Sequence, residues 1–283
     1  MNQEYLAFAK DFAKEAGKIM LSYFNNNRSE LGIEYKPDKT IVTKADTEIN
    51  DILIDRVKDR INRVMNPNPQ HAVKGEEKTF GKSDYTWVCD PVDGTNVFAR
   101  HIPVSVFSLA LLVKGESILG VVYDPFTDSL YSAVKGEGAF LNDIPIRVNN
   151  YQLDDRMSTA NFEMWPTAPY NMYSVVSELG RKTYFVNLGS IIRASVAVAS
   201  GDFSMAIFPG VIKCPHDIAA IKVIVEEAGG KVTSLFGDEE RYDQDIITGA
   251  VVSNGVVHDE VVRTVIKYHP YKIDPDTDCW STK

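Results

Sequence analysis

Cysteine is scarce in this chain, where only three of the 283 residues are cysteines, at positions 89, 214 and 279. Their number is odd, and no two of them have the Cys-x-x-Cys spacing. A framework of disulfide bonds is therefore not indicated. We expect these cysteines to be reduced thiols in a cytoplasmic protein.

Long apolar runs and clustered positive charge are also missing. No segment approaches the roughly 18 to 20 apolar residues that a membrane span needs, and residues 1–4 lack the basic and apolar regions that begin a secretory signal. Acidic residues outnumber basic ones by 39 to 30, which gives a formal net charge of −9. Because phosphate backbones demand concentrated lysine and arginine, we expect neither a nucleic acid nor a membrane as partner. A small phosphorylated metabolite is compatible with this charge, since metal ions in an acidic pocket reverse the local field.

The composition is that of an ordinary globular protein, with 44% hydrophobic and 24% charged residues, and the length suits one large domain or two lobes. Apolar residues recur at helical spacing over residues 5–24. They do so again over residues 49–61, in a second predicted helix that begins at Thr43. Thr43 and Asp46 have the spacing of a capping box, with Asp in place of Glu. We therefore predict two amphipathic helices in the first part of the chain.

The rest of the chain predicts first an antiparallel meander and then alternating helices and strands. We expect the strands of the meander at residues 104–113, 117–123, 129–134 and 139–141. A change in composition near residues 149–155 predicts a boundary between an N-terminal α+β lobe, residues 1–150, and a C-terminal α/β lobe, residues 151–268. In the second lobe we predict helices at residues 172–179, 190–199, 217–228 and 259–267, and strands at residues 184–188, 203–208 and 247–253. Residues 269–283 form a polar tail interrupted by proline.

The most informative segment runs from residue 87 to residue 95 and reads Trp-Val-Cys-Asp-Pro-Val-Asp-Gly-Thr. We predict that its apolar start ends a buried strand and that the remainder is a tight turn, because Pro91 fixes its own φ and Gly94 permits a left-handed bend. The turn would place the carboxylates of Asp90 and Asp93 on one rigid loop. Such a pair can bind hard divalent cations, and one carboxylate can bridge two metals roughly 3.5–4 Å apart. An ordinary turn explains the same residues equally well.

Other acidic residues have both a functional and a purely structural explanation. Glu76 and Glu77 follow a predicted short strand at residues 72–74, where a solvated pair is as good an explanation as a ligand pair. Asp46 and Asp217 are expected in the first turns of helices, where the helix dipole alone favours an acid.

Two further alternatives find little support in the sequence. His216 and Cys214 could bind a transition metal, but no other cysteine or histidine has a matching spacing, so a structural role is favoured. Ser190 and the five histidines do not predict a nucleophilic triad, because no Gly-x-Ser-x-Gly elbow occurs.

As a set, the motifs resemble the inositol monophosphatase family, a magnesium-dependent, lithium-sensitive phosphatase superfamily. In chain order they are Gly75-Glu76-Glu77, then Asp90-Pro91-Val92-Asp93-Gly94-Thr95, then Gly189-Ser190 before a helix, then Asp217-Ile218-Ala219-Ala220 leading to Glu226-Glu227-Ala228-Gly229-Gly230. The resemblance extends from the first helix to about residue 268. It implies an α+β fold, a layered αβαβα sandwich of the sugar-phosphatase type, with the active site between two lobes. It also implies a homodimer.

The resemblance implies a site for two to three Mg²⁺ ions. Glu76, Asp90 and the backbone carbonyl of Val92 would hold the first ion. Asp90, Asp93 and Asp217 would hold the second, with Asp90 bridging the pair. A weaker third ion would use Glu76 and waters.

The resemblance also implies catalytic roles and substrate contacts. Thr95, hydrogen-bonded to Asp46, would orient the attacking water together with Glu76. The substrate would be contacted by the backbone N–H groups of Gly94 and Thr95 and by Asp93, Ser190 and Asp217. The implied reaction is the hydrolysis of a small phosphate monoester by metal-activated water, with inositol monophosphate or a related sugar or polyol phosphate as substrate.

The chain departs from the family pattern at three positions. Val97 stands where the family usually has Asn, and His216 stands where a Trp usually precedes the metal-binding aspartate. Gly210 lies seven residues before Asp217, where members that hydrolyse inositol phosphates carry a Glu that binds ring hydroxyls. A phosphatase for histidinol phosphate, fructose 1,6-bisphosphate or 3′-phosphoadenosine phosphate is therefore an alternative. An alternative of another class is a non-catalytic protein that binds a metal or a phosphorylated metabolite on the same scaffold.

Overall fold

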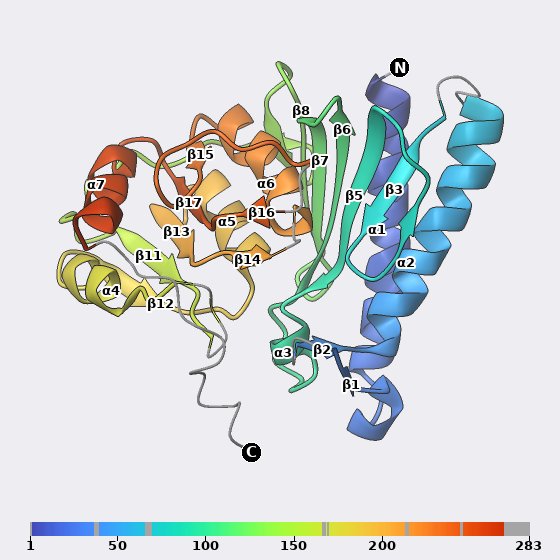
Figure 1. Ribbon diagram of the computed structural model, residues 1–283, viewed down its shortest axis with the longest axis horizontal. Helices are drawn as coiled ribbons and strands as arrows, with labels where there is room; N and C mark the ends of the chain where they lie inside the picture. Colours follow the sequence, from blue (N-terminus) through green and yellow to red (C-terminus); the bar gives the residue numbers. More distant parts are fainter. Residues whose placement is uncertain are drawn as a thin grey trace.

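The structure is a computed structural model that describes residues 2–36, 40–65, 70–165, 168, 170–212, 215–243 and 246–268. Helices and sheets alternate in it in the order α, β, α, β, α (Figure 1), which confirms the predicted layered sandwich. The outer helices on one side are α1 (Asn2–Phe24) and α2 (Lys44–Arg56), and those on the other side are α4 (Tyr173–Leu179) and α7 (His258–Tyr268). The middle layer contains α5 (Ile191–Ala199) and α6 (His216–Glu227).

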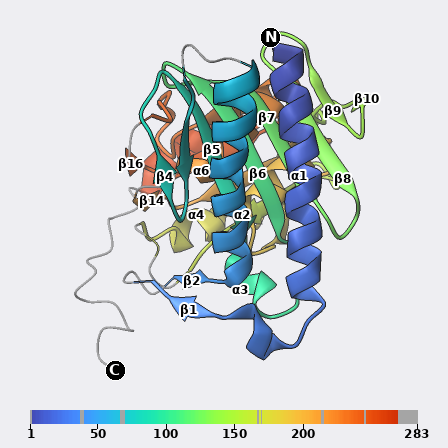
Figure 2. The same cartoon turned by 90° about the vertical axis from the view of Figure 1, so that its right-hand side faces the viewer.

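The first two helices lie side by side across the outer face of the first sheet (Figure 2). The helix predicted over residues 5–24 is confirmed as α1, whose apolar face is buried against the sheet. Helix α2 begins behind the predicted capping box of Thr43 and Asp46. The buried face predicted for residues 49–61 is confirmed, since Ile49, Leu53, Val57 and Ile61 are all fully buried. From Val57 the helix continues as a π-helical segment, η2 (Val57–Met65).

The first sheet is built around the predicted meander. Its strands, in spatial order, are β10 (Ile144–Pro145), β9 (Ala139–Leu141), β8 (Ser129–Val134), β7 (Glu116–Asp124), β6 (Val106–Val113), β5 (Tyr85–Asp93), β3 (Ala72–Gly75) and β4 (Thr79–Phe80). Strands β5 to β9 pair antiparallel in chain order, which confirms the meander. Strand β3 instead runs parallel to β5, so the segments that follow these two strands emerge at the same edge of the sheet.

The second sheet is shorter. Its strands, in spatial order, are β12 (Tyr184–Val186), β11 (Thr159–Phe162), β13 (Met205–Phe208), β17 (Ala250–Ser253) and β15 (Lys231–Thr233). Two small ribbons pair β1 (Glu34–Tyr35) with β2 (Ile41–Val42) and β14 (Val211–Ile212) with β16 (Ile246–Ile247), and a 3-10 turn η1 spans Arg28–Leu31. Strand β11 was not predicted, because its buried Asn161 interrupts the apolar pattern.

The informative segment differs from our prediction in one respect. The strand does not end at Cys89, because β5 continues through Asp93. Its pairing with β6 shifts register between Asp90 and Asp93, and this irregularity accommodates Pro91, which has no N–H for the ladder. The left-handed bend comes at Gly94, with φ of 80°, and a short helix α3 (Thr95–Phe98) follows.

The first sheet spans residues 72–145 and the second spans residues 159–253, while the division into lobes at residue 150 stays a prediction. Within the described ranges, no helix is both long and apolar enough to cross a membrane. Cys89 is free and buried, as a reduced thiol would be. Cys214, Cys279 and the predicted tail over residues 269–283 lie outside the described residues.

Helix α6 is the element that ties the two sheets together. Its buried side chains share one apolar cluster with strands of both sheets, through residues such as Ile221 and Ile224. It approaches β7 closely at Gly120, where an added Cβ would lie 2.5 Å from the carbonyl oxygen of Ala220. Nearby, the Ser117 hydroxyl donates a hydrogen bond of 2.5 Å to the Ala219 carbonyl. Gly120 therefore sets the position of the helix whose first turn carries Asp217.

We predict that Gly120→Ala lowers the free energy of unfolding by about 1–3 kcal/mol, because the extra methyl group overpacks the contact between β7 and α6. Urea denaturation followed by circular dichroism measures this change. The control is Glu116→Ala, an exposed position on the same strand, for which we expect a change within about 0.5 kcal/mol. Equal stability of Gly120→Ala and the wild type would show that this close approach does not position α6.

Candidate metal centre and active site

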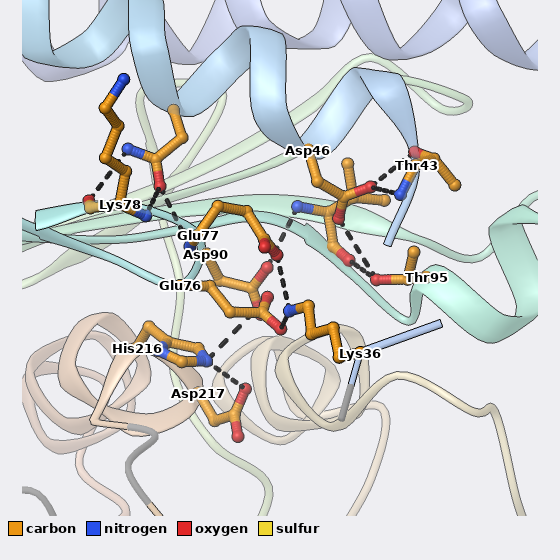
Figure 3. A network of polar contacts seen from close by, with 12 residues as sticks. Lys36, Thr43, Asp46, Glu76, Glu77, Lys78, Asp90, Thr95, His216 and Asp217 are labelled. Atoms are coloured by element: carbon orange, nitrogen blue, oxygen red, sulfur yellow. Dashed lines mark hydrogen bonds and ion pairs between the residues drawn. The ribbon is translucent and has the colours of Figure 1, made fainter. Parts of the chain in front are cut away.

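The site lies where β3 ends beside β5, since Gly75 pairs with Cys89 and the chain then continues to Glu76 on one side and Asp90 on the other. Figure 3 shows the side chains that meet there. The Glu76 N–H donates to the carbonyl of Cys89 at 3.1 Å, which places Glu76 beside Asp90. Asn50 on α2 secures the following loop, since its Oδ1 accepts the N–H groups of Glu77 and Lys78 at 3.1 and 3.0 Å. The alignment of two parallel strands thus brings together acids that are distant in the sequence.

Oxygen atoms from several segments converge there. Ligand atoms of Asp90, Asp93 and Asp217 lie within 4.8 Å of one another, although Asp217 comes from α6 in the middle layer. Carboxylates of Asp46, Glu76 and Glu77 form a second such group within the same limit. The structure therefore brings together every acidic residue that the sequence singled out for metal binding.

These carboxylates raise one another's pKa values. Burial raises the pKa of Asp90 well above its usual range, and the charges of Glu76 and Asp93 raise it further. Burial, followed by the charges of Asp93 and Glu76, raises the pKa of Asp217 in the same way. The pKa of Asp93 rises to about 7 through burial, although it accepts hydrogen bonds from the Ser190 hydroxyl and from a backbone N–H.

Divalent cations fit this arrangement. Ionising all of these buried carboxylates together costs free energy unless positive charge is nearby. Their oxygens are the ligands that hard divalent cations prefer. Asp90 belongs both to the group with Asp93 and Asp217 and to a group with Glu76 and His216. Its carboxylate is therefore common to both groups. The carbonyl of Val92, predicted as a further ligand, accepts the Thr95 hydroxyl at 2.9 Å.

Thr95 and Asp46 are in contact, as the resemblance implied. The Thr95 hydroxyl donates to Asp46 Oδ1 at 3.3 Å, and the other oxygen of Asp46 accepts the N–H and the hydroxyl of Thr43. Asp46 is fully buried, and burial together with the charge of Glu76 raises its pKa to about 7. The capping box that starts α2 therefore also fixes the carboxylate that Thr95 contacts.

Two glycines allow the loop after β5 to approach the start of α5. An added Cβ at Gly94 would lie 2.8 Å from the carbonyl oxygen of Gly189, and one at Gly189 would lie 2.7 Å from Val97. Ser190 is the N-cap of α5, is only 1% exposed, and gives its hydroxyl proton to Asp93. This supports a role for Ser190 in positioning Asp93, while direct contact with substrate stays a prediction.

Sequence reasoning missed Lys36. Its ammonium group lies 2.7 Å from Glu76 and 2.6 Å from Glu77. Burial alone would lower its pKa, but the two carboxylates outweigh that effect and raise it. The lysine therefore supplies positive charge to one side of the acidic group, and no local motif indicated the contact.

Sequence reasoning also missed Asn161 and Glu163, at the end of β11. The Asn161 amide donates to Glu163 at 2.9 Å, and its oxygen accepts the N–H of Leu188 at 3.0 Å. Glu163 accepts the N–H of Gly189 at 3.0 Å. These side chains position the loop that leads into Ser190, and the interrupted apolar pattern of β11 was the only signal for them.

Gly210 occupies a position that excludes a side chain. Its φ is +84°, and an added Cβ would lie 2.6 Å from the backbone nitrogen of Gly249. A carboxylate that binds ring hydroxyls could not be accommodated there without moving the backbone. The departure from the family pattern at this position is thus built into the packing.

Known proteins resemble this chain over most of its length. A sequence model of the inositol monophosphatase family matches residues 1–269. A fructose-1,6-bisphosphatase/inositol-1-monophosphatase of Thermotoga maritima is 32% identical over 266 residues, which cover 92% of this chain and 95% of that protein. A histidinol-phosphatase of Chlorobaculum parvum is 30% identical and covers 92% of this chain and 96% of its own. A solved structure of a Thermotoga maritima IMPase superposes with a TM-score of 0.79 at 28% identity, covering 93% and 97% of the two chains.

We predict opposite effects of Asp90→Asn with and without metal. In EDTA the variant should unfold at a higher temperature than the wild type, because a neutral amide removes repulsion among buried carboxylates. Saturating Mg²⁺ should raise the melting temperature of the wild type more than that of the variant, since a ligand that binds only the folded state stabilises it. Differential scanning calorimetry measures both melting temperatures.

Asp51→Asn, a surface change on α2, is the control and should behave like the wild type. An identical Mg²⁺ response in Asp90→Asn and the wild type would contradict the site.

Proposed function

Because this chain belongs to the inositol monophosphatase family, whose members are metal-dependent phosphoric monoester hydrolases, we propose that it hydrolyses a small sugar or polyol phosphate with Mg²⁺ as cofactor. The observation that carries the proposal is the convergence of Glu76, Asp90, Asp93 and Asp217 at the end of β5. A phosphate monoester dianion repels an incoming nucleophile, so its hydrolysis requires concentrated positive charge at this point.

Two to three Mg²⁺ ions would occupy the site. Glu76, Asp90 and the carbonyl of Val92 would bind the first, and Asp90, Asp93 and Asp217 would bind the second. A weaker third would rest on Glu76. When bound, the ions lower the pKa of the attacking water and neutralise the charge on the phosphate and the leaving alkoxide.

The chain itself orients the water. Thr95 has a single hydroxyl proton, which Asp46 or the Val92 carbonyl accepts. With that proton directed away, the lone pairs of Thr95 are free to accept a hydrogen bond from the water. Glu76, which belongs to the same acidic group, would accept the proton that the water gives up.

The phosphate would be bound by backbone rather than by arginine. The left-handed bend at Gly94 turns the chain into α3, so the N–H groups of Gly94 and Thr95 come at the start of a helix, where anions are favoured. Asp93 and Asp217 would face the leaving group through the second ion.

The substrate proposed first is inositol monophosphate or a related sugar phosphate. The relatives named above act, by their names, on inositol 1-phosphate, fructose 1,6-bisphosphate or histidinol phosphate. Because Gly210 cannot offer a carboxylate to ring hydroxyls, we expect weaker discrimination among these esters than a pocket with that group would give. The expected homodimer rests on the resemblance alone.

Phosphate release from a panel of esters tests the proposal. The panel contains inositol 1-phosphate, fructose 1,6-bisphosphate, histidinol phosphate and 3′-phosphoadenosine 5′-phosphate, each with Mg²⁺ and with EDTA. We expect Mg²⁺-dependent release from at least one. Tight binding of an ester by calorimetry without any release would instead favour the non-catalytic alternative that the departures at Val97, Gly210 and His216 raise.

We predict that Thr95→Ala lowers kcat by roughly 10²-fold or more, because it removes the hydrogen-bond acceptor that orients the water. The stability of the fold should change little, since Thr95 lies in a short helix at the edge of the core. Thr127→Ala, at an exposed turn, is the matched control and should keep the wild-type kcat. A normal kcat in Thr95→Ala would remove Thr95 from the mechanism.

A further inference from the structure

His216, the first residue of α6, projects into the acidic group instead of into an apolar core. Its Nε2 lies 3.9 Å from Glu76 Oε2 and 3.8 Å from Asp217 Oδ1. Figure 3 shows the ring directed towards these carboxylates. Ligand atoms of His216, Glu76 and Asp90 all lie within 4.8 Å of one another, which is a span that a single ion can bridge.

The surroundings of this imidazole differ from those of the other buried histidines. The two ring nitrogens of His71 contact Tyr5 and Trp87, and those of His258 contact Thr233 and Ser253, all within hydrogen-bonding distance. A buried imidazole normally needs such partners.

The neighbours of His216 are carboxylates instead. It is only 5% exposed, and Glu76 and Asp217 lie 3.9 and 3.8 Å from its Nε2, within the range of an ion pair but beyond that of a hydrogen bond. An imidazole nitrogen and carboxylate oxygens at these distances can share one cation.

The orientation of the ring suits a ligand. With its proton on Nδ1, the imidazole directs a lone pair from Nε2 towards Glu76 and Asp217. A neutral imidazole is a common metal ligand in proteins.

We propose that His216 Nε2 is a metal ligand alongside Glu76 and Asp90, and that this mixed nitrogen–oxygen site can also take a divalent first-row transition ion in place of the first Mg²⁺. The inference rests on the metal centre of the proposed function, but not on which ester is the substrate. Carboxylate and carbonyl oxygens suit Mg²⁺, whereas imidazole suits ions further along the series, such as Co²⁺ and Zn²⁺. The second group, Asp90 with Asp93 and Asp217, contains only oxygen ligands and keeps its affinity for Mg²⁺.

Pulsed electron paramagnetic resonance of the wild-type protein with Mn²⁺ tests the ligand directly. We expect the echo to be modulated by the nitrogen of a coordinated imidazole. When the histidines are labelled with ¹⁵N, the modulation frequencies should shift from those of ¹⁴N to those of ¹⁵N. Bound Mn²⁺ without nitrogen modulation would overturn the inference and leave the proposed function intact. A protein that binds no Mn²⁺ would overturn both.

Calorimetric titration with Co²⁺ and with Mg²⁺ provides the comparison between variants. In His216→Phe, which keeps the ring but removes its nitrogens, Co²⁺ affinity should fall at least about tenfold, while Mg²⁺ affinity should change less than about threefold. His101→Asn is the control for the loss of an imidazole elsewhere and should bind both ions as the wild type does, because His101 contacts Phe24 and Asn26 away from the site. Equal losses for both ions in His216→Phe, or no loss for Co²⁺, would contradict a nitrogen ligand.

Discussion

The burial of several carboxylates in one place is the constraint on which the rest of the site depends. Asp90 and Asp93 are almost fully buried, and Asp217 and Glu76 lie beside them. Burial and mutual charge raise the pKa values of these aspartates, so the metal-free site is electrostatically unfavourable. The fold must hold the acidic groups together until cations neutralise them, and much of the polar structure around the site serves that purpose.

Three different elements bring the acids together. The parallel pairing of β3 with β5 places Glu76 next to Asp90, the capping box of α2 orients Asp46, and the close contact of α6 with Gly120 sets the position of Asp217. Each is rigid for a separate reason: strand pairing, helix capping and close packing. None of the three involves a metal ligand as a hydrogen-bonding partner other than Asp46 and Glu76, so the backbone fixes where the acids lie.

Much of this could be predicted from the sequence, because the signals were local. The period of the apolar residues gave α1 and the meander, and the spacing of Thr43 and Asp46 gave a helix start that the structure confirms. The acids of the site were recognised as an ordered set of motifs. Their convergence could not be derived from spacing, because it depends on which strands pair in parallel.

The misses have tertiary causes. Proline suggested that the strand ended before Asp90, whereas a shift in register lets β5 continue through Asp93. Lys36 contacts Glu76 and Glu77 across 40 and 41 residues of sequence, which no local pattern encodes. His216 was considered only with Cys214, because its carboxylate neighbours are distant in the sequence. In the folded chain it lies beside Asp90 of β5 and Glu76 of the loop after β3.

The most direct test of the account is a crystal structure of the protein with Mn²⁺, in which anomalous scattering locates the ions. The account predicts two sites roughly 3.5–4 Å apart, with Asp90 oxygens bound to both and Asp217 bound to one. Ions found only elsewhere on the molecule, or an Asp217 side chain directed away from them, would contradict it.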